Sequence, residues 1–293
     1  KFSDVLRMFS ANHEMNERTA QSQPESELRG PRPYSHTATT EKVLSLLERY
    51  PLGDGRFLDL GAGEGYLTQK LCELLRDQSQ RPEECVAACD LYPETFRLPE
   101  IECTAADFNG HIPFEDKTFD FIVCQEVIEH VPNQQHLIEE IFRLLRPGGT
   151  AWITTPNTLS SNARIRSLFT GTMPLFDILP IGASDVARSS GHINPISVYY
   201  LCYFAKRAGF SRVDFSIDRI KRSAVCLSLP LYPLARVCKW FHDARRRSRP
   251  YWEENRPFAD ALYAWRTFVG RTIILEVTRP IQATSDGSEM QAA

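Results

Sequence analysis

Short apolar runs alternate along the chain with segments whose apolar residues recur at helical spacing. Residues 57–60 and 119–124 are short apolar runs, which is typical of buried strands. Residues 40–50 carry apolar side chains at helical spacing, and residues 195–209 lie between a proline near a helix start and a glycine at its end. A strand follows at residues 212–217. Strands that alternate with helices predict an α/β domain with a mainly parallel sheet.

A glycine-rich turn follows the first apolar run, in the string FLDLGAGEGYLT. Gly61, Gly63 and Gly65 lack a Cβ, so the backbone can turn sharply there and a ligand can approach the main chain. The third glycine comes two residues after the second, whereas the dinucleotide fingerprint G-x-G-x-x-G places it three after. The spacing therefore argues against NAD or FAD, and it predicts a different nucleotide-binding turn that follows the acid Asp59.

Further blocks follow this turn in the order that a βαβ nucleotide fold predicts. An acid that ends the second strand is expected to bond ribose hydroxyls. Alone, each block could be an ordinary crossover, a helix cap or a turn. The blocks are Asp90 in CVAACDLYPE, Asp107-Phe108 after a third strand near residues 101–105, FDFIVCQEVIEHV with a fourth strand at residues 119–124, and LLRPGGTAWITTPN with a Pro-Gly-Gly turn before a fifth strand.

Together the turn and these blocks, over residues 57–157, resemble the class I S-adenosylmethionine-dependent methyltransferases. The resemblance implies a Rossmann-like α/β fold with a seven-stranded, mostly parallel sheet and helices on both faces. It also implies that the last strand, at residues 271–280, runs antiparallel between the fifth and the sixth. S-adenosylmethionine is the cofactor implied, and its binding residues would be Asp59, Gly61, Gly63, Gly65, Asp90, Leu91, Asp107, Phe108 and Gln125.

The block after the fourth strand carries three polar residues suited to the acceptor. Glu126, Glu129 and His130 stand at i, i+3 and i+4, which on a helical turn predicts one shared face above the methyl group. His192 is the natural fourth partner. Methyl transfer is mostly a matter of positioning, and a base is needed only for a poorly ionised hydroxyl. We therefore predict His130, Glu126 and His192 as the catalytic residues.

The same four residues resemble a metal site. Ubiquinone-type O-methyltransferases and small-RNA 3′-end 2′-O-methyltransferases share the E-x-x-E-H spacing with a later histidine and use it for a divalent metal. The resemblance implies Glu126, Glu129, His130 and His192 as ligands of Mg²⁺ or Mn²⁺, and two imidazoles suit Mn²⁺ at least as well as Mg²⁺. A metal-free role of His130 as a base or orienting group stays open.

Length and composition fit one enlarged domain with additions. Of 293 residues, 42% are hydrophobic, which is ordinary for a globular protein. The eight cysteines include no C-x-x-C pair, which argues against a disulfide framework or a zinc site. No cleavable signal peptide and no apolar run of about 20 residues stand out, so we expect a cytoplasmic protein. The predicted parts are a tail at 1–33, a methyltransferase domain at 34–280 with a substrate cover at 156–192, and a tail at 281–293.

A basic and aromatic insertion is predicted at residues 218–270. Residues 218–271 hold 12 Lys or Arg against 5 Asp or Glu, a local excess of +7 in a chain whose formal net charge is −3. Three interpretations stay open: a helical pair packed on the core or on a second subunit, contact with a membrane surface or a lipid-linked substrate, and binding of a polyanion. Membrane contact would place the protein at the inner face of the membrane.

The predicted function is S-adenosylmethionine-dependent O-methylation of a sugar, a glycan or a small-metabolite hydroxyl. An RNA 2′-O-methyltransferase that uses a divalent metal is one alternative. The rest of the chain sums to −10, so it offers a nucleic acid no broad basic face and disfavours that partner. The other alternative is a cofactor-binding scaffold subunit without turnover.

Overall fold

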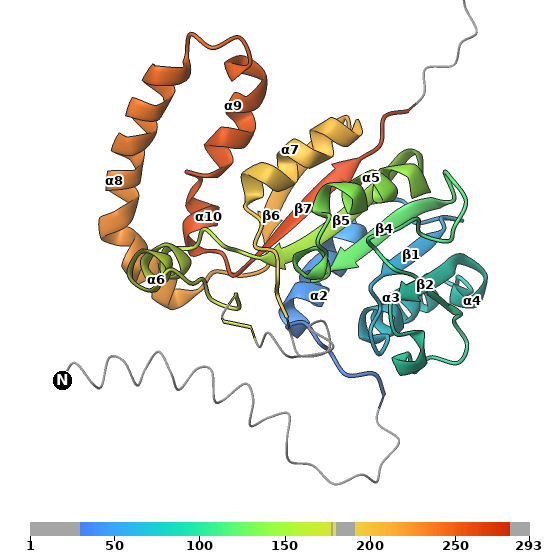
Figure 1. The fold of residues 1–293 in the computed structure, drawn as a ribbon. Helices are drawn as coiled ribbons and strands as arrows, with labels where there is room; N and C mark the ends of the chain where they lie inside the picture. The colour runs from blue at the N-terminus through green and yellow to red at the C-terminus, as the bar shows by residue number, and fades with distance from the viewer. Residues whose placement is uncertain (1–29, 177, 180–190, 282–293) are drawn as a thin grey trace, which may run out of the picture. The chain divides into compact units, whose positions relative to one another are not determined.

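The computed structural model describes residues 30–176, 178–179 and 191–281, so most of both predicted tails lies outside the described residues. A seven-stranded sheet with the order β3-β2-β1-β4-β5-β7-β6 forms the centre of this part (Figure 1). β7 is antiparallel to both of its neighbours, while β1 to β5 pair in parallel, and the predicted fold is confirmed. The strands are β1 Phe57–Leu60, β2 Val86–Asp90, β3 Cys103–Ala105, β4 Phe119–Gln125, β5 Leu145–Pro156, β6 Arg212–Ile217 and β7 Thr272–Thr278.

Helices cover both faces of the sheet, because the strands bury both of theirs. On β1, Leu58 and Leu60 belong to the buried cluster that includes α5 and α7, whereas Phe57 belongs to the cluster of α2 and α3. This alternation follows from the period of two along a strand. The helices are α2 Thr37–Leu47, α3 Tyr66–Asp77, α4 Pro82–Cys85, α5 Gln134–Leu144, α6 Ser161–Thr170, α7 Val198–Ala208, α8 Arg222–Arg246, α9 Trp252–Ala261 and α10 Trp265–Val269, with 3₁₀ turns η1 Pro93–Thr95 and η2 Ile128–His130.

Two local predictions need correction. The Pro-Gly-Gly segment is not a separate turn before the fifth strand, because β5 already begins at Leu145 and carries a register shift against β4 between Phe119 and Phe121. The predicted cover at 156–192 is not all loop, since α6 forms within it. Ser160 caps α6 by accepting a hydrogen bond from the Ala163 amide, and Gly171 ends it at φ +72°. Residues 177 and 180–190 of the cover lie outside the described residues.

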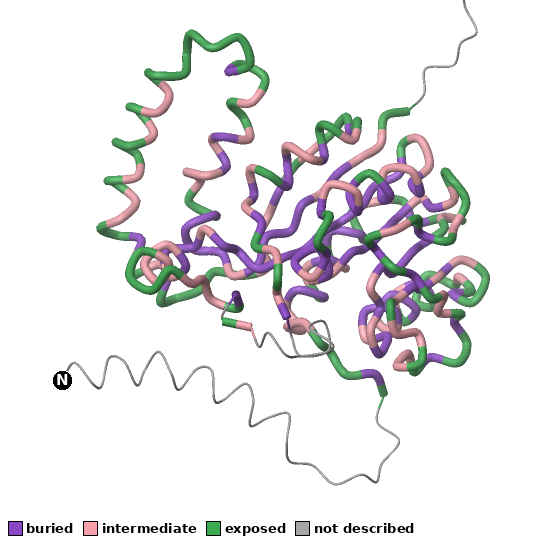
Figure 2. Tube along the Cα trace, in the orientation of Figure 1, coloured by how far each residue is buried: buried purple, intermediate pink, exposed green. Residues whose placement is uncertain are grey.

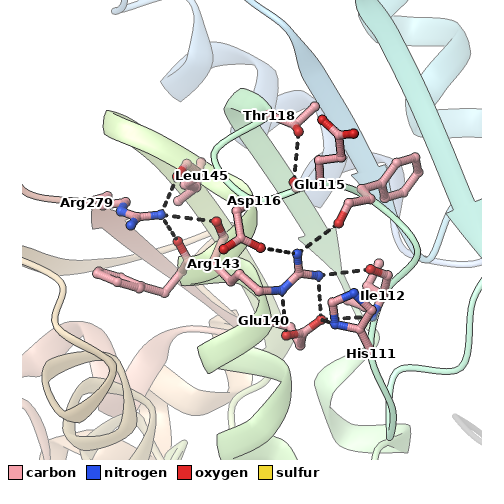
Figure 3. Close-up of polar contacts among 11 residues, drawn as sticks. His111, Ile112, Glu115, Asp116, Thr118, Glu140, Arg143, Leu145 and Arg279 are labelled. Atoms are coloured by element: carbon pink, nitrogen blue, oxygen red, sulfur yellow. Dashed lines mark hydrogen bonds and ion pairs between the residues drawn. The ribbon is translucent and has the colours of Figure 1, made fainter.

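Arginines bind the amino ends of β4 and β5 to α5. The Arg143 guanidinium donates to Glu140, Asp116 and the carbonyls of Ile112 and Phe114 (Figure 3). Arg279 donates through one nitrogen to three carbonyls, those of Phe142, Arg143 and Leu145. These carbonyls include the last ones of α5, which have no partner within the helix. The polar network therefore fixes the sheet edge opposite the carboxyl ends of the strands.

The segment between β6 and β7 forms a helical hairpin. α8 and α9 project from the sheet, with α8 on the outside (Figure 1), and an isolated bridge between Ile220 and Gly270 joins the two ends of the segment. Pro230 and Pro233 lie inside α8, which runs for 25 residues. None of the helices in the described part of the chain is both long enough and apolar enough to cross a membrane.

Candidate active site

The glycine turn lies at the carboxyl end of β1, where ligands bind in open α/β sheets. Gly61, Gly63 and Gly65 all have left-handed φ angles, +86°, +54° and +95°, and Gly65 is the N-cap of α3. The amides of Gly61 and Ala62 donate to the carbonyl of Cys89 on β2, at 2.8 and 3.1 Å. The turn is therefore held in shape by backbone bonds to the neighbouring strand.

Two carboxylates support this turn from β1 and β2. Asp59 is buried and accepts a 2.6 Å bond from the Thr68 hydroxyl. Burial, with the nearby Asp90, raises the pKa of Asp59 to about 7. Asp90 accepts from the amide of Gly63 at 2.8 Å and from that of Tyr92 at 2.9 Å. Both acids thus make hydrogen bonds within the chain.

Side chains crowd the glycine positions. A Cβ on Gly63 would lie 2.7 Å from the ring of Tyr34, and one on Gly61 would lie 2.2 Å from Val127. Val127 is part of the segment between β4 and η2. The glycine turn therefore lies against the segment that carries Glu126, Glu129 and His130.

A link between Tyr34 and Glu64 was not predicted from the sequence. Glu64 accepts hydrogen bonds from the Tyr34 hydroxyl at 3.3 Å and from the Arg32 amide at 3.0 Å, and it forms an ion pair with Arg97 at 3.1 Å. Glu64 stands between the second and third glycines of the turn, and no spacing rule connects it with a tyrosine 30 positions earlier. Tyr34 nevertheless lies over the turn through this carboxylate.

The other predicted cofactor residues occupy different environments. Leu91 is exposed, and Asp107 is exposed and accepts from Asn109 at 2.9 Å. Phe108 is buried in the cluster on the α5 side of the sheet. Gln125 donates to the hydroxyls of Ser35 and Thr40 ahead of and within α2, and its carbonyl oxygen has no partner among the described residues.

Glu126 is not part of a helical turn with Glu129 and His130, so the expected shared face is wrong. Its φ is +56°, in the left-handed region, and only Ile128–His130 form a 3₁₀ turn. The Glu126 amide donates to the hydroxyl of Thr154 on β5 at 3.0 Å. Burial raises the pKa of Glu126 to about 7, against the opposing charge of Arg271.

Glu129, His130 and His192 form a compact cluster. Their nearest ligand atoms all lie within 4.8 Å of one another, and the two imidazole rings meet edge to face at 4.7 Å. Backbone bonds hold the cluster together, since the amides of Ile193 and Asn194 donate to the carbonyl of Glu129 at 3.1 and 3.0 Å. The structure thus gathers three of the four predicted ligands and leaves Glu126 outside the group.

The cluster has unsatisfied polar atoms. Glu129 is fully buried, and within the described chain both of its carboxylate oxygens and Nδ1 of His192 lack a hydrogen-bond partner. Burial, followed by repulsion from Glu126, raises the pKa of Glu129 well above its usual range. Burial and the neighbouring His130 lower the pKa of His192 to about 4. Buried polar groups usually have partners, so these atoms require an explanation.

His130 has a defined orientation. Its Nδ1 lies 3.0 Å from the carbonyl of Gly191, which assigns the proton to Nδ1 and the lone pair to Nε2. Burial lowers the pKa of His130, so the imidazole is neutral near pH 7. A neutral ring with a free Nε2 can accept a proton or bind a cation.

Comparison with known proteins agrees with this fold. The family model described as a methyltransferase domain matches residues 34–214. The chain therefore belongs to the methyltransferase-domain family, and its resemblance to class I S-adenosylmethionine-dependent methyltransferases is confirmed. The match ends before the predicted insertion.

Two curated relatives are similar over part of the chain. A ubiquinone biosynthesis O-methyltransferase from Xylella fastidiosa is 26% identical over 168 residues, which is 54% of this chain and 60% of the relative. One with the same name from Xanthomonas oryzae pv. oryzae is 27% identical over 175 residues, 54% of this chain and 62% of that one. The chain thus spans about 60% of the length of these relatives. The structure of an S-adenosylmethionine-dependent methyltransferase from Archaeoglobus fulgidus is also similar. The two chains are 15% identical with a TM-score of 0.48, and the match covers 82% of this chain and 94% of the Archaeoglobus chain.

Proposed function

We propose that the protein transfers a methyl group from S-adenosylmethionine to a hydroxyl oxygen of a small metabolite or a sugar. The observation that carries the proposal is the contact between the glycine turn and the segment of the cluster, through Gly61 and Val127. Cofactor and acceptor would meet there. The ubiquinone biosynthesis O-methyltransferases among the relatives support oxygen as the atom that is methylated.

The chemistry assigned to the chain is orientation and proton removal. The Gly191 carbonyl holds His130 with Nε2 free, so that it can take the proton of an acceptor hydroxyl as the oxygen attacks the methyl carbon. The neutral ring is the form that serves as a base, and burial favours it. The Glu126 amide is held by the Thr154 hydroxyl, and the backbone strain of Glu126 is consistent with a role at the site.

A divalent cation also fits the cluster. The unpaired carboxylate of Glu129, Nδ1 of His192 and Nε2 of His130 offer one oxygen and two nitrogens. This donor set favours Mn²⁺ over Mg²⁺, because Mg²⁺ prefers oxygen ligands. Bound there, the cation would acidify the acceptor hydroxyl, and His130 would then be a ligand rather than the base.

Calorimetric titration with S-adenosylmethionine, S-adenosylhomocysteine and NAD is the first test. Both adenosyl compounds should bind and NAD should not, because the glycine spacing disfavours a dinucleotide. Sugars and phenolic metabolites are then supplied as acceptors with Mn²⁺ or with a chelator, and mass spectrometry locates the methyl group. Cofactor binding without transfer to any hydroxyl, together with a stable partner on pull-down, would favour the scaffold alternative.

The metal set is tested with two matched carboxylate variants. Saturating Mn²⁺ should stabilise the parent protein by about 2.7 kcal/mol at 100 times its Kd, measured by thermal unfolding. Glu129→Gln should remove this stabilisation, whereas Glu126→Gln should keep most of it, since only Glu129 lies in the cluster. Loss of the Mn²⁺ stabilisation in both variants would mean that Glu126 is also a ligand, as in the predicted set of four. Stabilisation by Mn²⁺ in neither the parent nor the variants would leave His130 as a metal-free base.

A further inference from the structure

The outward face of α8 is more apolar than a surface helix normally presents. Its exposed positions follow helical spacing from Cys226 through Pro230, Pro233 and Val237 to Ala244. At about 100° per residue the large apolar side chains among them fill an arc of about 140°, and the row of exposed positions runs over 19 residues, or about 27 Å. Its large side chains, with their exposed fractions, are Leu229 67%, Leu234 60%, Val237 53%, Trp240 66% and Phe241 55%.

The inner face of α8 already has its partners. Tyr232 packs edge-on against Trp265 and Phe268, and Lys239 forms ion pairs with Asp243 and Asp260. The burial pattern along α8 agrees, with exposed residues along its outer side (Figure 2). Packing inside the hairpin therefore does not explain the apolar arc.

Positive charge frames the arc. Arg222 lies at its start, Arg236 at one edge, and a cluster of exposed arginines lies at and just beyond its end. Asp243 is the one acid in α8, and it is bound to Lys239. The arginines of the end cluster are Arg245, Arg246, Arg247 and Arg249.

From these observations we infer that the outward face of α8 lies in the interface of an anionic lipid bilayer, with its apolar arc among the acyl chains and its arginines at the headgroups. A helix with aromatic and aliphatic residues on one side and basic residues around them has this preference. A second copy of the chain fits less well. If two copies paired through this face, their arginines would find no carboxylate on the partner copy, because the face carries none.

The membrane face is connected to the acceptor side of the sheet. α6 begins five residues after β5 ends, and its Ser161 hydroxyl lies 2.6 Å from that of Ser228 on α8. α6 also exposes Leu168 and Phe169, by 78% and 80%. The inference holds for any acceptor, and its test needs no methyl transfer.

Vesicle flotation with the full chain is the test. The protein should float with vesicles of phosphatidylcholine and one-third phosphatidylglycerol, at least tenfold more than with phosphatidylcholine alone, and added salt should weaken binding. The double variant Leu234→Glu, Trp240→Glu should lose at least tenfold. Tyr200→Glu, at a 54% exposed position on α7, is the matched control and should bind like the parent. Unchanged S-adenosylmethionine affinity and circular dichroism would show that each variant is folded.

Several results would overturn the inference. They are no flotation of the parent protein, equal flotation with neutral vesicles, and flotation of the double variant at the parent level. Analytical ultracentrifugation could give a further contrary result. If the parent protein is a dimer and the double variant is a monomer, the face binds a second copy of the chain. Tryptophan emission gives an independent reading: anionic vesicles should shift it to the blue in the parent, and Trp240→Phe should bind but lose most of that shift.

Discussion

The proposed cofactor half and the proposed acceptor half of the site differ in how their acids are bonded. Beside the glycine turn, Asp59, Asp90 and Glu64 each accept hydrogen bonds from the chain itself. In the acceptor half, Glu129 is fully buried and neither of its oxygens has a partner within the described residues. The acids beside the glycine turn therefore have hydrogen-bond partners within the chain. The carboxylate of Glu129 keeps its oxygens available, which is what a site that binds a cation or a polar acceptor requires.

Under the proposed function, this difference predicts that the specificity for the acceptor resides in the cluster. The turn is fixed by backbone bonds to β2 and does not depend on the acceptor. The cluster depends on contacts between η2 and residues 191–194, which are far apart in sequence. Changes in that segment can alter the acceptor without disturbing the turn.

The largest effect should come from His130→Ala, which removes the proposed base or ligand. We expect kcat to fall by about 10²–10⁴-fold, the usual range for a general base, while the Kd for S-adenosylmethionine stays within a few fold. Enzyme assays and calorimetry on the same preparation measure both. His136→Ala is the control, because it also removes an imidazole that bonds a backbone carbonyl, that of Gly110, but His136 lies on α5 and is not part of the cluster. Equal losses of rate and affinity would mean that His130 shapes the cofactor pocket instead.

Gly63→Val should break the cofactor half. Valine at φ +54° is strained, and its Cβ would meet the ring of Tyr34, so we expect cofactor affinity to fall by about 100-fold, or about 3 kcal/mol. Gly53→Val is a matched control, since Gly53 also has a positive φ but no atom within 4 Å of its Cβ position. Calorimetry measures the affinity. Parent-like binding in folded Gly63→Val protein would refute the assignment of the turn.

Asp59→Asn should change the pH dependence of stability. The pKa of Asp59 is about 7 in the folded chain against 3.8 for the free side chain, so between these values the folded state binds more protons and stability falls as pH rises. The difference corresponds to at most about 4 kcal/mol, and we expect about half of it. Urea unfolding without cofactor at pH 5 and pH 8 should show a smaller fall in the variant. An identical fall in both proteins would mean that Asp59 is ionised throughout.

Sequence patterns predicted the parts of the molecule that local rules determine. The glycine turn follows from its spacing, and β6 begins and ends where the pattern places it. The seven-stranded sheet with its antiparallel last strand was implied by the resemblance to the class I methyltransferases. The left-handed backbone of Glu126 could not be predicted, because it depends on bonds to Thr154 on β5. Neither could the Tyr34–Glu64 link, which joins residues 30 positions apart. Tertiary contacts decide both.

The arginine network at the amino ends of β4 and β5 has a consequence for how this protein can change over time. β4 has seven residues, so about 20 Å of strand separates its first residue, beside Arg143, from the segment that carries His130. Substitutions near one end therefore have little direct effect on the other. A lineage could exchange one acceptor for another at the carboxyl edge while the opposite edge keeps the scaffold rigid, and mutations that strengthen the arginine edge would compensate for the destabilisation that new activities bring.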